Sequence, residues 1–495
     1  MIRDRIEAAL SVDLFTDRRW FAGSATGISA VRLVDGVHLE SDDAAALAIV
    51  EVVDEHSQPK CYLVPFMVGP DGATAREARD GDGVWRALAV AMASGRVIRT
   101  EMGGALVCRP GLALAAFAPD GAQELGQWSE RPLGADQSNT SIVLGERLVL
   151  KAFRRVVPGL NPDLEMSAYL AEECGLSLVP ALVGSAEYIG QDGAVSTMAV
   201  LHEWIAGAED AYETIAERLA DWIAAPGVVA LEYATEDAAA LGTTLAELHA
   251  VLAQAGVPTP AGEGADAGTP ADAGALADFT PRQATAEDLR AWRRDAEASL
   301  DRGLCLFAGD AETGAELRAA SAAIRRRLAI LEQPTKRPLL TRIHGDLHLG
   351  QILRTSAGFV LVDFEGDPLR PMEDRRALAS PMRDVATLLR SLDHVSSSAE
   401  RRAVRRGWSA GEHTGLDIDA WRRRSRDRLL AAYRTGLRRA GVGIVVDAGL
   451  IDAFEVAKEC DELVYAATYL PDWLWAPRAG LARLVGRAAG EGLGT

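Results

Sequence analysis

The sequence predicts an α+β protein in which a strand-rich first part is followed by a mainly helical second part. Up to about residue 206, short runs rich in β-branched residues alternate with clusters of Gly, Pro and Asp, a pattern typical of antiparallel sheets. From about residue 207 onward, apolar residues recur mostly at helical spacing. Because 495 residues exceed what one hydrophobic core usually organises, we expect two or three domains.

Composition and charge argue against several classes of protein. The formal net charge of −19 disfavours a nucleic-acid or anionic-membrane binder, because such partners reward clustered Lys and Arg. The basic runs 401–406 and 422–428 are expected to be solvated helix faces. The five cysteines are scattered and form no CxxC pair, so neither a disulfide framework nor a zinc site is expected.

No segment of the sequence predicts membrane insertion or export. The apolar runs are shorter than the roughly 18 residues of a membrane-spanning helix. The first residues, Met1–Glu7, carry acidic side chains and no long apolar segment, unlike a secretory signal. We therefore expect a cytoplasmic monomer without nucleic-acid or membrane partners.

The first 125 residues are expected to hold a small antiparallel sheet. Its strands are predicted at 30–34, 47–53 and 61–68, where β-branched residues lie between turn-forming clusters. A helical pattern follows at 84–94.

The segment 126–206 is a second strand-rich part. The runs 140–144 and 147–151 flank Gly145-Glu146, and a two-residue connection with glycine first predicts a type II′ hairpin. A helix is expected after Asn161, because Asn is a good cap and Pro162 suits the first helical position.

Helices dominate the predicted remainder, residues 207–495. One spans 241–252, and Val385, Leu388, Leu389 and Leu392 form the apolar stripe of another. Between them, residues 255–281 are mostly Ala, Gly, Pro, Asp and Thr, which predicts a loop or insertion.

An ordered set of polar residues in the second half predicts phosphoryl transfer. Asp346 is followed by Gln351, and Asp363 comes directly after a predicted strand at 358–362 that would return it to the same loop. One carboxylate can orient a substrate hydroxyl, while an amide oxygen and a second carboxylate hold Mg²⁺ on the phosphates of ATP. Read singly, each residue is better explained as a polar turn residue between apolar strands, but the ordered set of three favours phosphoryl transfer.

The first half offers candidate nucleotide contacts. Lys151 ends a predicted strand and Glu165 lies in the first turn of the next helix; in a kinase fold the two would pair, with Lys151 on the ATP phosphates. Ser138, Asn139 and Thr140 belong to a small, polar stretch that could also approach phosphates, although a plain loop explains it as well. The strand that contains Glu203 could present its backbone to adenine or serve only as a connection.

Taken together, these residues resemble the aminoglycoside-phosphotransferase branch of the protein-kinase-like fold, and within it the actinobacterial maltokinases and glucosamine kinases. The more specific likeness is carried by five stretches: Arg19–Gly23, Gln137–Ser141, His344–Gln351, Asp363–Gly366 and Ser380–Val385. The resemblance implies a bilobal fold with an N-terminal cap (1–125), a strand-rich small lobe that binds ATP (126–206) and a mainly helical large lobe (207–495).

The resemblance also implies roles for single residues. Asp346 becomes the catalytic base, and Gln351 with Asp363 become the magnesium ligands. Gln351 departs from the Asn usual in the wider superfamily, but its amide oxygen can still bind the metal. Asp384, at the start of a helix, is expected to brace the catalytic loop.

The acceptor is predicted from a separate acidic segment near the C-terminus. Glu455, Glu459 and Glu462 would share one helix face, close in sequence to Trp473. Carboxylates beside aromatic rings suit a protonated aminosugar, although a solvated acidic face explains the glutamates too.

By resemblance, the acceptor is glucosamine, phosphorylated at its 6-hydroxyl, with His348 as a further substrate contact. The alternatives are maltose phosphorylated at its 1-hydroxyl, or a catalytically silent kinase-like binding protein.

Overall fold

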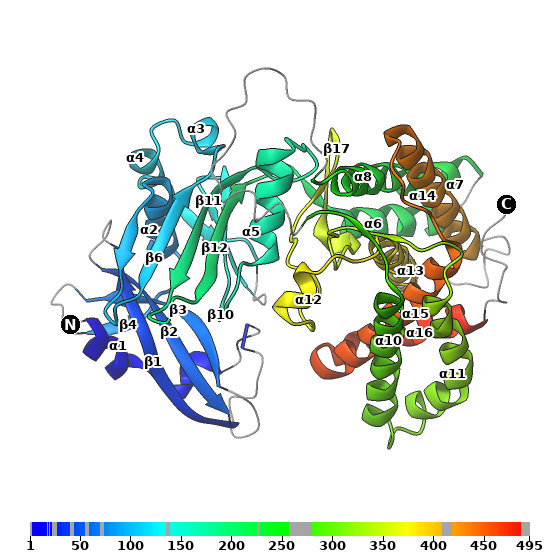
Figure 1. Ribbon diagram of the computed structural model, residues 1–495, viewed down its shortest axis with the longest axis horizontal. Helices are drawn as coiled ribbons and strands as arrows, with labels where there is room; N and C mark the ends of the chain where they lie inside the picture. Colours follow the sequence, from blue (N-terminus) through cyan, green and yellow to red (C-terminus); the bar gives the residue numbers. More distant parts are fainter. Residues whose placement is uncertain are drawn as a thin grey trace. The chain divides into compact units, whose positions relative to one another are not determined.

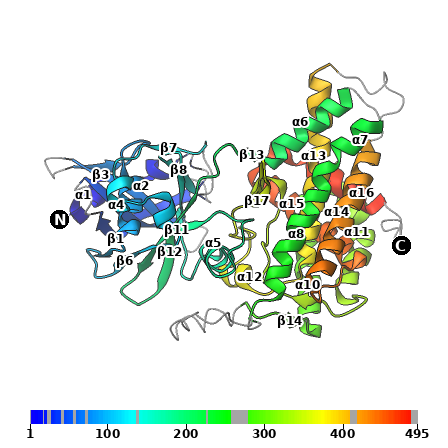
Figure 2. The same cartoon turned by 90° about the horizontal axis from the view of Figure 1, so that it is seen from above.

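The computed structural model describes residues 2–16, 18, 20–21, 27–39, 44–54, 59–69, 74–134, 139–224, 228–256, 279–407 and 418–486. Ser138 and most of the loop predicted at 255–281 lie outside the described residues. The chain divides into two compact units, Met1–Gly207 and Ala208–Thr495 (Figures 1 and 2). The first unit is built on strands and the second on helices, so the predicted α+β class is confirmed.

The first unit holds two sheets. The smaller sheet has the strand order β1-β2-β3-β10 with β4 paired to β3, and the seven-stranded sheet has the order β5-β6-β11-β12-β9-β8-β7. The strands are β1 (Ile28–His38), β2 (Ala45–Asp54), β3 (Lys60–Val68), β4 (Ala75–Glu77), β5 (Val97–Arg99), β6 (Ala105–Pro110), β7 (Glu130–Pro132), β8 (Thr140–Leu144), β9 (Leu148–Ala152), β10 (Arg155–Val156), β11 (Leu182–Ile189) and β12 (Val195–Glu203). The three strands predicted in the first 125 residues are confirmed as β1, β2 and β3.

The helices of this unit are short, apart from the one predicted at 84–94, which is confirmed as α2. They are α1 (Ile2–Ala9), α2 (Val84–Ala93), α3 (Leu114–Phe117), α4 (Ala122–Leu125) and α5 (Pro162–Ser167), which continues as a π-helical turn at Ala168–Glu173. Asn161 caps α5 as predicted, because its side chain accepts a hydrogen bond from the backbone N–H of Asp163 at 2.9 Å.

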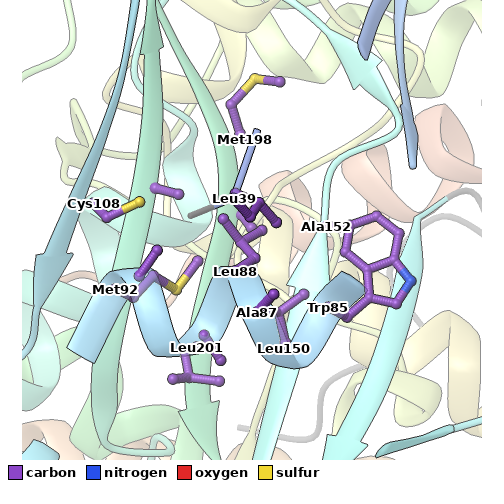
Figure 3. Close-up of a cluster of buried hydrophobic side chains, with 14 of the residues drawn as sticks. Leu39, Trp85, Ala87, Leu88, Met92, Cys108, Leu150, Ala152, Met198 and Leu201 are labelled. Carbon is purple, nitrogen blue, oxygen red and sulfur yellow. The ribbon is translucent and has the colours of Figure 1, made fainter. Parts of the chain in front are cut away.

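One apolar core joins both sheets through α2. Trp85, Leu88 and Met92 of α2 pack with Leu39 beside the smaller sheet and Leu150 of the larger one (Figure 3). Since β5 and β6 share their sheet with β7, β8, β9, β11 and β12, residues on both sides of position 125 contribute to this core. The separate cap at 1–125 therefore stays a prediction.

The connection between β8 and β9 differs from the predicted type II′ turn. Both Gly145 and Glu146 have positive φ, 57° and 53°, which is the pattern of a type I′ turn. The glycine is required by space as well, because a Cβ at position 145 would lie 2.6 Å from the ring of Trp128. The hairpin itself is confirmed by the pairing of Leu144 with Leu148.

The second unit is a set of helices with two small sheets. Its helices are α6 (Ala211–Ala224), α7 (Val228–Ala234), α8 (Glu236–Ala253), α10 (Ala286–Leu306), α11 (Thr313–Leu328), α12 (Met372–Arg376), α13 (Met382–Arg405), α14 (Ile418–Ala440), α15 (Ala448–Tyr469) and α16 (Trp475–Gly486). Its strands are β13 (Glu209–Asp210), β14 (Arg282–Gln283), β15 (Leu339–Leu340), β16 (Ile352–Thr355) and β17 (Gly358–Leu361). Helices α8 and α14 lie side by side (Figure 2).

Both predicted helices of this unit are confirmed, as α8 and α13, and the apolar stripe on α13 is buried. The predicted strand at 358–362 is confirmed as β17, which pairs antiparallel with β16. None of the helices in the described part of the chain is long and apolar enough to cross a membrane.

Candidate active site

The loop that carries Asp346 is held in place by Asp384, the first acidic residue of α13. The carboxylate of Asp384 accepts hydrogen bonds from the backbone N–H groups of His344, at 2.8 Å, and Gly345, at 2.9 Å. This confirms the predicted bracing role. Burial opposes ionisation, but the hydrogen bond with His249 and the contacts with the loop hold the pKa of Asp384 below its ordinary value.

His249 of α8 is itself held in place by two hydrogen-bonding neighbours. Its Nε2 lies 3.2 Å from Oδ2 of Asp384 and its Nδ1 lies 2.7 Å from the hydroxyl of Tyr433 on α14. All three side chains are buried. The loop is thus positioned by contacts from α8, α13 and α14, as a catalytic group requires.

Asp346 follows Gly345, whose φ of 86° favours glycine. Its Oδ1 lies 2.8 Å from Nζ of Lys458, and its Oδ2 lies 3.9 Å from Nε2 of His348. Although burial opposes ionisation, these cationic neighbours lower the pKa of Asp346 to about 2. Asp346 is therefore ionised and able to accept a hydrogen bond near neutral pH.

The two predicted magnesium ligands lie next to each other. Nε2 of Gln351 donates to Oδ2 of Asp363 at 2.9 Å, and the backbone N–H of Val362 donates to the carbonyl of Gln351 at 3.0 Å. The return of Asp363 to the catalytic loop is thus confirmed. Asp363 has a φ of 66°, a left-handed conformation that costs on the order of 1–3 kcal/mol outside glycine and is concentrated at functional sites.

In the first unit, Lys151 contacts an acidic residue that the sequence did not single out. Its Nζ lies 2.9 Å from Oδ2 of Asp163, near the start of α5. Glu165 is buried two residues further along α5, and its pairing with Lys151 stays a prediction. The contact between Lys151 and Asp163 joins β9 to the start of α5.

The other predicted nucleotide contacts lie at ordinary positions of the larger sheet. Thr140 begins β8 and accepts a hydrogen bond from Nε of Arg154 at 2.7 Å, while Asn139 precedes it and is half-buried. Glu203 ends β12, where its carboxylate accepts a hydrogen bond from the backbone N–H of Ala181 at 3.3 Å.

The prediction that Glu455 and Glu459 bind the acceptor is wrong. Both side chains are 0% exposed on α15, and each meets the guanidinium of Arg390 from α13. Arg426 of α14 adds a hydrogen bond of 2.8 Å to Glu455, and Nε2 of His394 lies 3.1 Å from Glu459. Because a buried charge must be paired, these carboxylates are occupied by the protein itself, and the solvated-face alternative fails for the same reason.

These side chains belong to a larger group that we call the buried ion cluster. It comprises the acidic residues Asp393, Glu455 and Glu459 together with Arg390, His394, Arg422, Arg426 and Arg483. The basic run 422–428, expected to be a solvated face, therefore sends two arginines inward.

Glu462 lies next to Lys458, which contacts Asp346, whereas Trp473 packs on His394. Oε1 of Glu462 lies 3.9 Å from Nζ of Lys458, and its Oε2 lies 3.4 Å from Nδ1 of His394. The ring of Trp473 packs edge-on to the imidazole of His394 with centroids 6.3 Å apart. His394 also contacts buried Glu459, and the carboxylates of Glu459 and Glu462 raise the pKa of His394 despite burial.

A cavity opens next to the loop within the second unit. It is lined by Gly345, Lys458 and the polar or aromatic residues Trp292, Asp295, Asp367, Arg370, Arg383, Phe454 and Asp461. A mixture of hydrogen-bonding groups and rings is typical of a site for a small polar molecule.

Comparison with known proteins identifies the family. The model of the phosphotransferase enzyme family matches residues 129–425, more than half of the chain. The chain belongs to this family. The matched residues include Lys151, the loop that carries Asp346, and Asp363. As a member of this family, the protein transfers a phosphoryl group to a hydroxyl group.

Relatives of this phosphotransferase extend over most of its length. It is 28% identical to a glucosamine kinase of Mycolicibacterium smegmatis over 84% of this chain and 94% of the relative. It is 29% identical to a glucosamine kinase of Streptacidiphilus jiangxiensis over 81% and 88% of the two chains. A crystal structure of a glucosamine kinase, 25% identical, superposes with a TM-score of 0.64 and covers 92% of this chain and 91% of that one. The predicted kinase-like fold is thus confirmed.

Two residues of the site were missed at the level of sequence. Asp163 lies two residues after the predicted cap Asn161, in the first turn of α5, where an acidic residue is ordinary. Lys458 lies between the glutamates of α15, and it is one of only four lysines in the chain, which has 52 Lys and Arg together. In a chain that uses arginine for nearly all of its cationic side chains, a lysine on the acidic segment could have marked Lys458 as a candidate site residue.

Proposed function

We propose that this phosphotransferase is an ATP-dependent kinase that converts D-glucosamine to glucosamine 6-phosphate. The observation that carries the proposal is the braced loop, in which ionised Asp346 and the Gln351–Asp363 pair lie in one unit. The two relatives named glucosamine kinases support the choice of acceptor over maltose.

Asp346 is proposed as the catalytic base. Its Oδ2 accepts the hydrogen bond of the acceptor hydroxyl, whose oxygen forms a bond to the γ-phosphorus of ATP. The bond from that phosphorus to the bridging oxygen breaks, ADP leaves, and the hydroxyl proton passes to Asp346.

Gln351 and Asp363 would hold Mg²⁺. An amide oxygen and a carboxylate are hard oxygen donors, which fit this ion, and the two side chains are already in contact. When bound, the ion neutralises charge on the ATP phosphates.

The proposed metal site predicts a change in magnesium dependence. We expect Asp363→Asn to raise the Mg²⁺ concentration for half-maximal activity at least about tenfold, because one charged ligand becomes neutral. The measurement is a Mg²⁺ titration at saturating ATP, with a parallel titration of Mg²⁺ binding by calorimetry in the presence of ADP. An unchanged titration would remove Asp363 from the metal site.

Residues of the first unit are proposed to bind the nucleotide. Lys151, oriented by Asp163 and paired with Glu165, contacts the α and β phosphates. Ser138, Asn139 and Thr140 approach the phosphates, and the strand end at Glu203 meets the adenine edge. A cap at 1–125, a monomeric state and a cytoplasmic location are part of the same proposal.

On the acceptor side, we propose His348, Glu462 and Trp473 as sugar contacts. His348 is the most exposed of the groups around Asp346, with 40% of its side chain accessible, and Glu462 is 23% exposed. Glu462 is the one predicted glutamate that the protein leaves within reach of a ligand.

The acceptor is tested by ATP consumption with glucosamine, glucose, N-acetylglucosamine, maltose and aminoglycosides. We expect glucosamine to give the largest kcat/KM. Glu462→Gln should then raise the KM for glucosamine about tenfold, the loss of one charge-assisted hydrogen bond, and leave the KM for ATP unchanged. Preference for maltose would replace the proposed substrate, and turnover of none of these acceptors would favour a silent kinase-like protein.

A further inference from the structure

Lys458 reaches the catalytic loop from a distant part of the chain. It lies on α15, and its Nζ is 2.8 Å from Oδ1 of Asp346 although 112 residues separate them. The two side chains are 17% and 16% exposed, so the contact is largely shielded from water. It is therefore stronger than an ordinary surface ion pair.

The charged groups around Lys458 and Asp346 show how the ammonium of Lys458 affects the carboxylate of Asp346. Asp346 faces Lys458, His348 and His344, and Lys458 faces Asp346, Asp367 and Glu462. Without the ammonium, burial of Asp346 and the nearby carboxylate of Glu462 would both disfavour the ionised form of Asp346. With it, Oδ1 is occupied and only Oδ2, on the side of His348, is left to accept from a hydroxyl.

We propose that Lys458 is a positioning residue for the catalytic carboxylate: it fixes Oδ1 of Asp346, so that Oδ2 is presented to the acceptor hydroxyl. The inference rests on the proposed role of Asp346 as base. It also explains why position 458 is a lysine and not an arginine. A compact ammonium binds one oxygen of a carboxylate, whereas a guanidinium tends to bind both.

A merely structural ion pair is the competing explanation. In that case Lys458 only ties α15 to the loop, and its loss lowers stability without changing how Asp346 titrates. The two roles differ in the pH dependence of catalysis. Since the neighbouring ammonium lowers the pKa of Asp346, removing it should raise that pKa by roughly one to three units.

The test compares Lys458→Met, Lys458→Arg and the matched control Lys336→Met in the full chain. Lys336 is exposed. We expect Lys458→Met to lower kcat about 100-fold, the effect of misplacing a reacting group by about 1 Å, with the KM for ATP unchanged. The acidic limb of its pH profile of kcat/KM should move to higher pH by roughly one to three units.

Lys458→Arg keeps the charge, so it should return the acidic limb to the wild-type position while kcat recovers only in part. Thermal unfolding and ADP binding are measured for each variant. The proposal is overturned if Lys458→Met keeps kcat within about twofold, if its acidic limb does not move, or if Lys458→Arg behaves like the Met variant. If Lys458→Met fails to fold, kcat of Lys458→Arg is the deciding measurement. A wild-type kcat for Lys458→Arg would show that contact of the cation with a single oxygen of Asp346 is not needed, and would overturn the proposal.

Failure of this inference is separable from failure of the proposed function. The variants are compared with whichever acceptor the wild-type protein uses, and with basal ATP hydrolysis if it uses none. A wild-type protein that prefers another sugar changes the proposed substrate, while the comparison of Lys458 variants proceeds unaltered.

Discussion

Asp346→Asn is expected to lower kcat about 100- to 10 000-fold, the contribution of a positioned general base. The amide keeps the shape of the side chain but cannot take the proton of the acceptor hydroxyl. It also removes the charge that holds Lys458, so the ammonium at 2.8 Å loses its counter-ion. Single-turnover kinetics with the acceptor give the rate of transfer.

Nucleotide binding should survive this substitution. Isothermal titration with ADP and Mg²⁺ serves as the control, and we expect affinity within about threefold of wild type because Asp346 is not proposed to bind the nucleotide. The same substitution at Asp301, which is exposed on α10 and does not line the cavity, should leave kcat within about threefold. Near-normal turnover by Asp346→Asn would exclude its role as base.

Arg390→Met is expected to have the largest effect on stability. Its guanidinium lies 2.7 Å from Glu459, 3.2 Å from Glu455 and 3.0 Å from Asp393, and its side chain is 2% exposed. Methionine fills a similar volume but leaves three buried carboxylates short of a partner. Breaking a buried ion pair in this way costs about 3–5 kcal/mol.

Urea unfolding of the full chain, followed by a probe in the second unit, measures this loss. Arg405→Met is the matched control, because Arg405 is exposed in the last turn of the same helix. The control should stay within about 0.5 kcal/mol of wild type. A loss below about 1 kcal/mol for Arg390→Met would show that the cluster relaxes or admits water when its central cation is removed.

Features fixed by neighbouring residues were predictable from sequence. The cap at Asn161, the return of Asp363 by β17 and the buried stripe on α13 each depend on residues within a few positions. The order of Asp346, Gln351 and Asp363 was enough to predict the loop and its chemistry. Asp384 was also placed correctly, through the resemblance to the aminoglycoside-phosphotransferase branch.

Features that depend on distant partners were not predictable. Helical spacing placed Glu455, Glu459 and Glu462 on one face but could not say that Arg390, 65 residues earlier, would neutralise two of them. The pairing of Lys458 with Asp346 spans 112 residues. The predicted turn type at Gly145 was wrong for a related reason. The backbone conformation of this turn accompanies the close approach of Trp128, which is not adjacent in sequence.

The buried ion cluster also bears on the making of the protein. Asp393 of α13 accepts a hydrogen bond of 2.6 Å from Arg483 of α16, 90 residues later in the chain. During translation, α13 leaves the ribosome well before this partner exists. At the usual elongation rate the interval is roughly 5–20 seconds, during which the carboxylates and the apolar stripe of α13 lack their final surroundings. We expect the helical unit to close only late in synthesis, and to depend on chaperones until then.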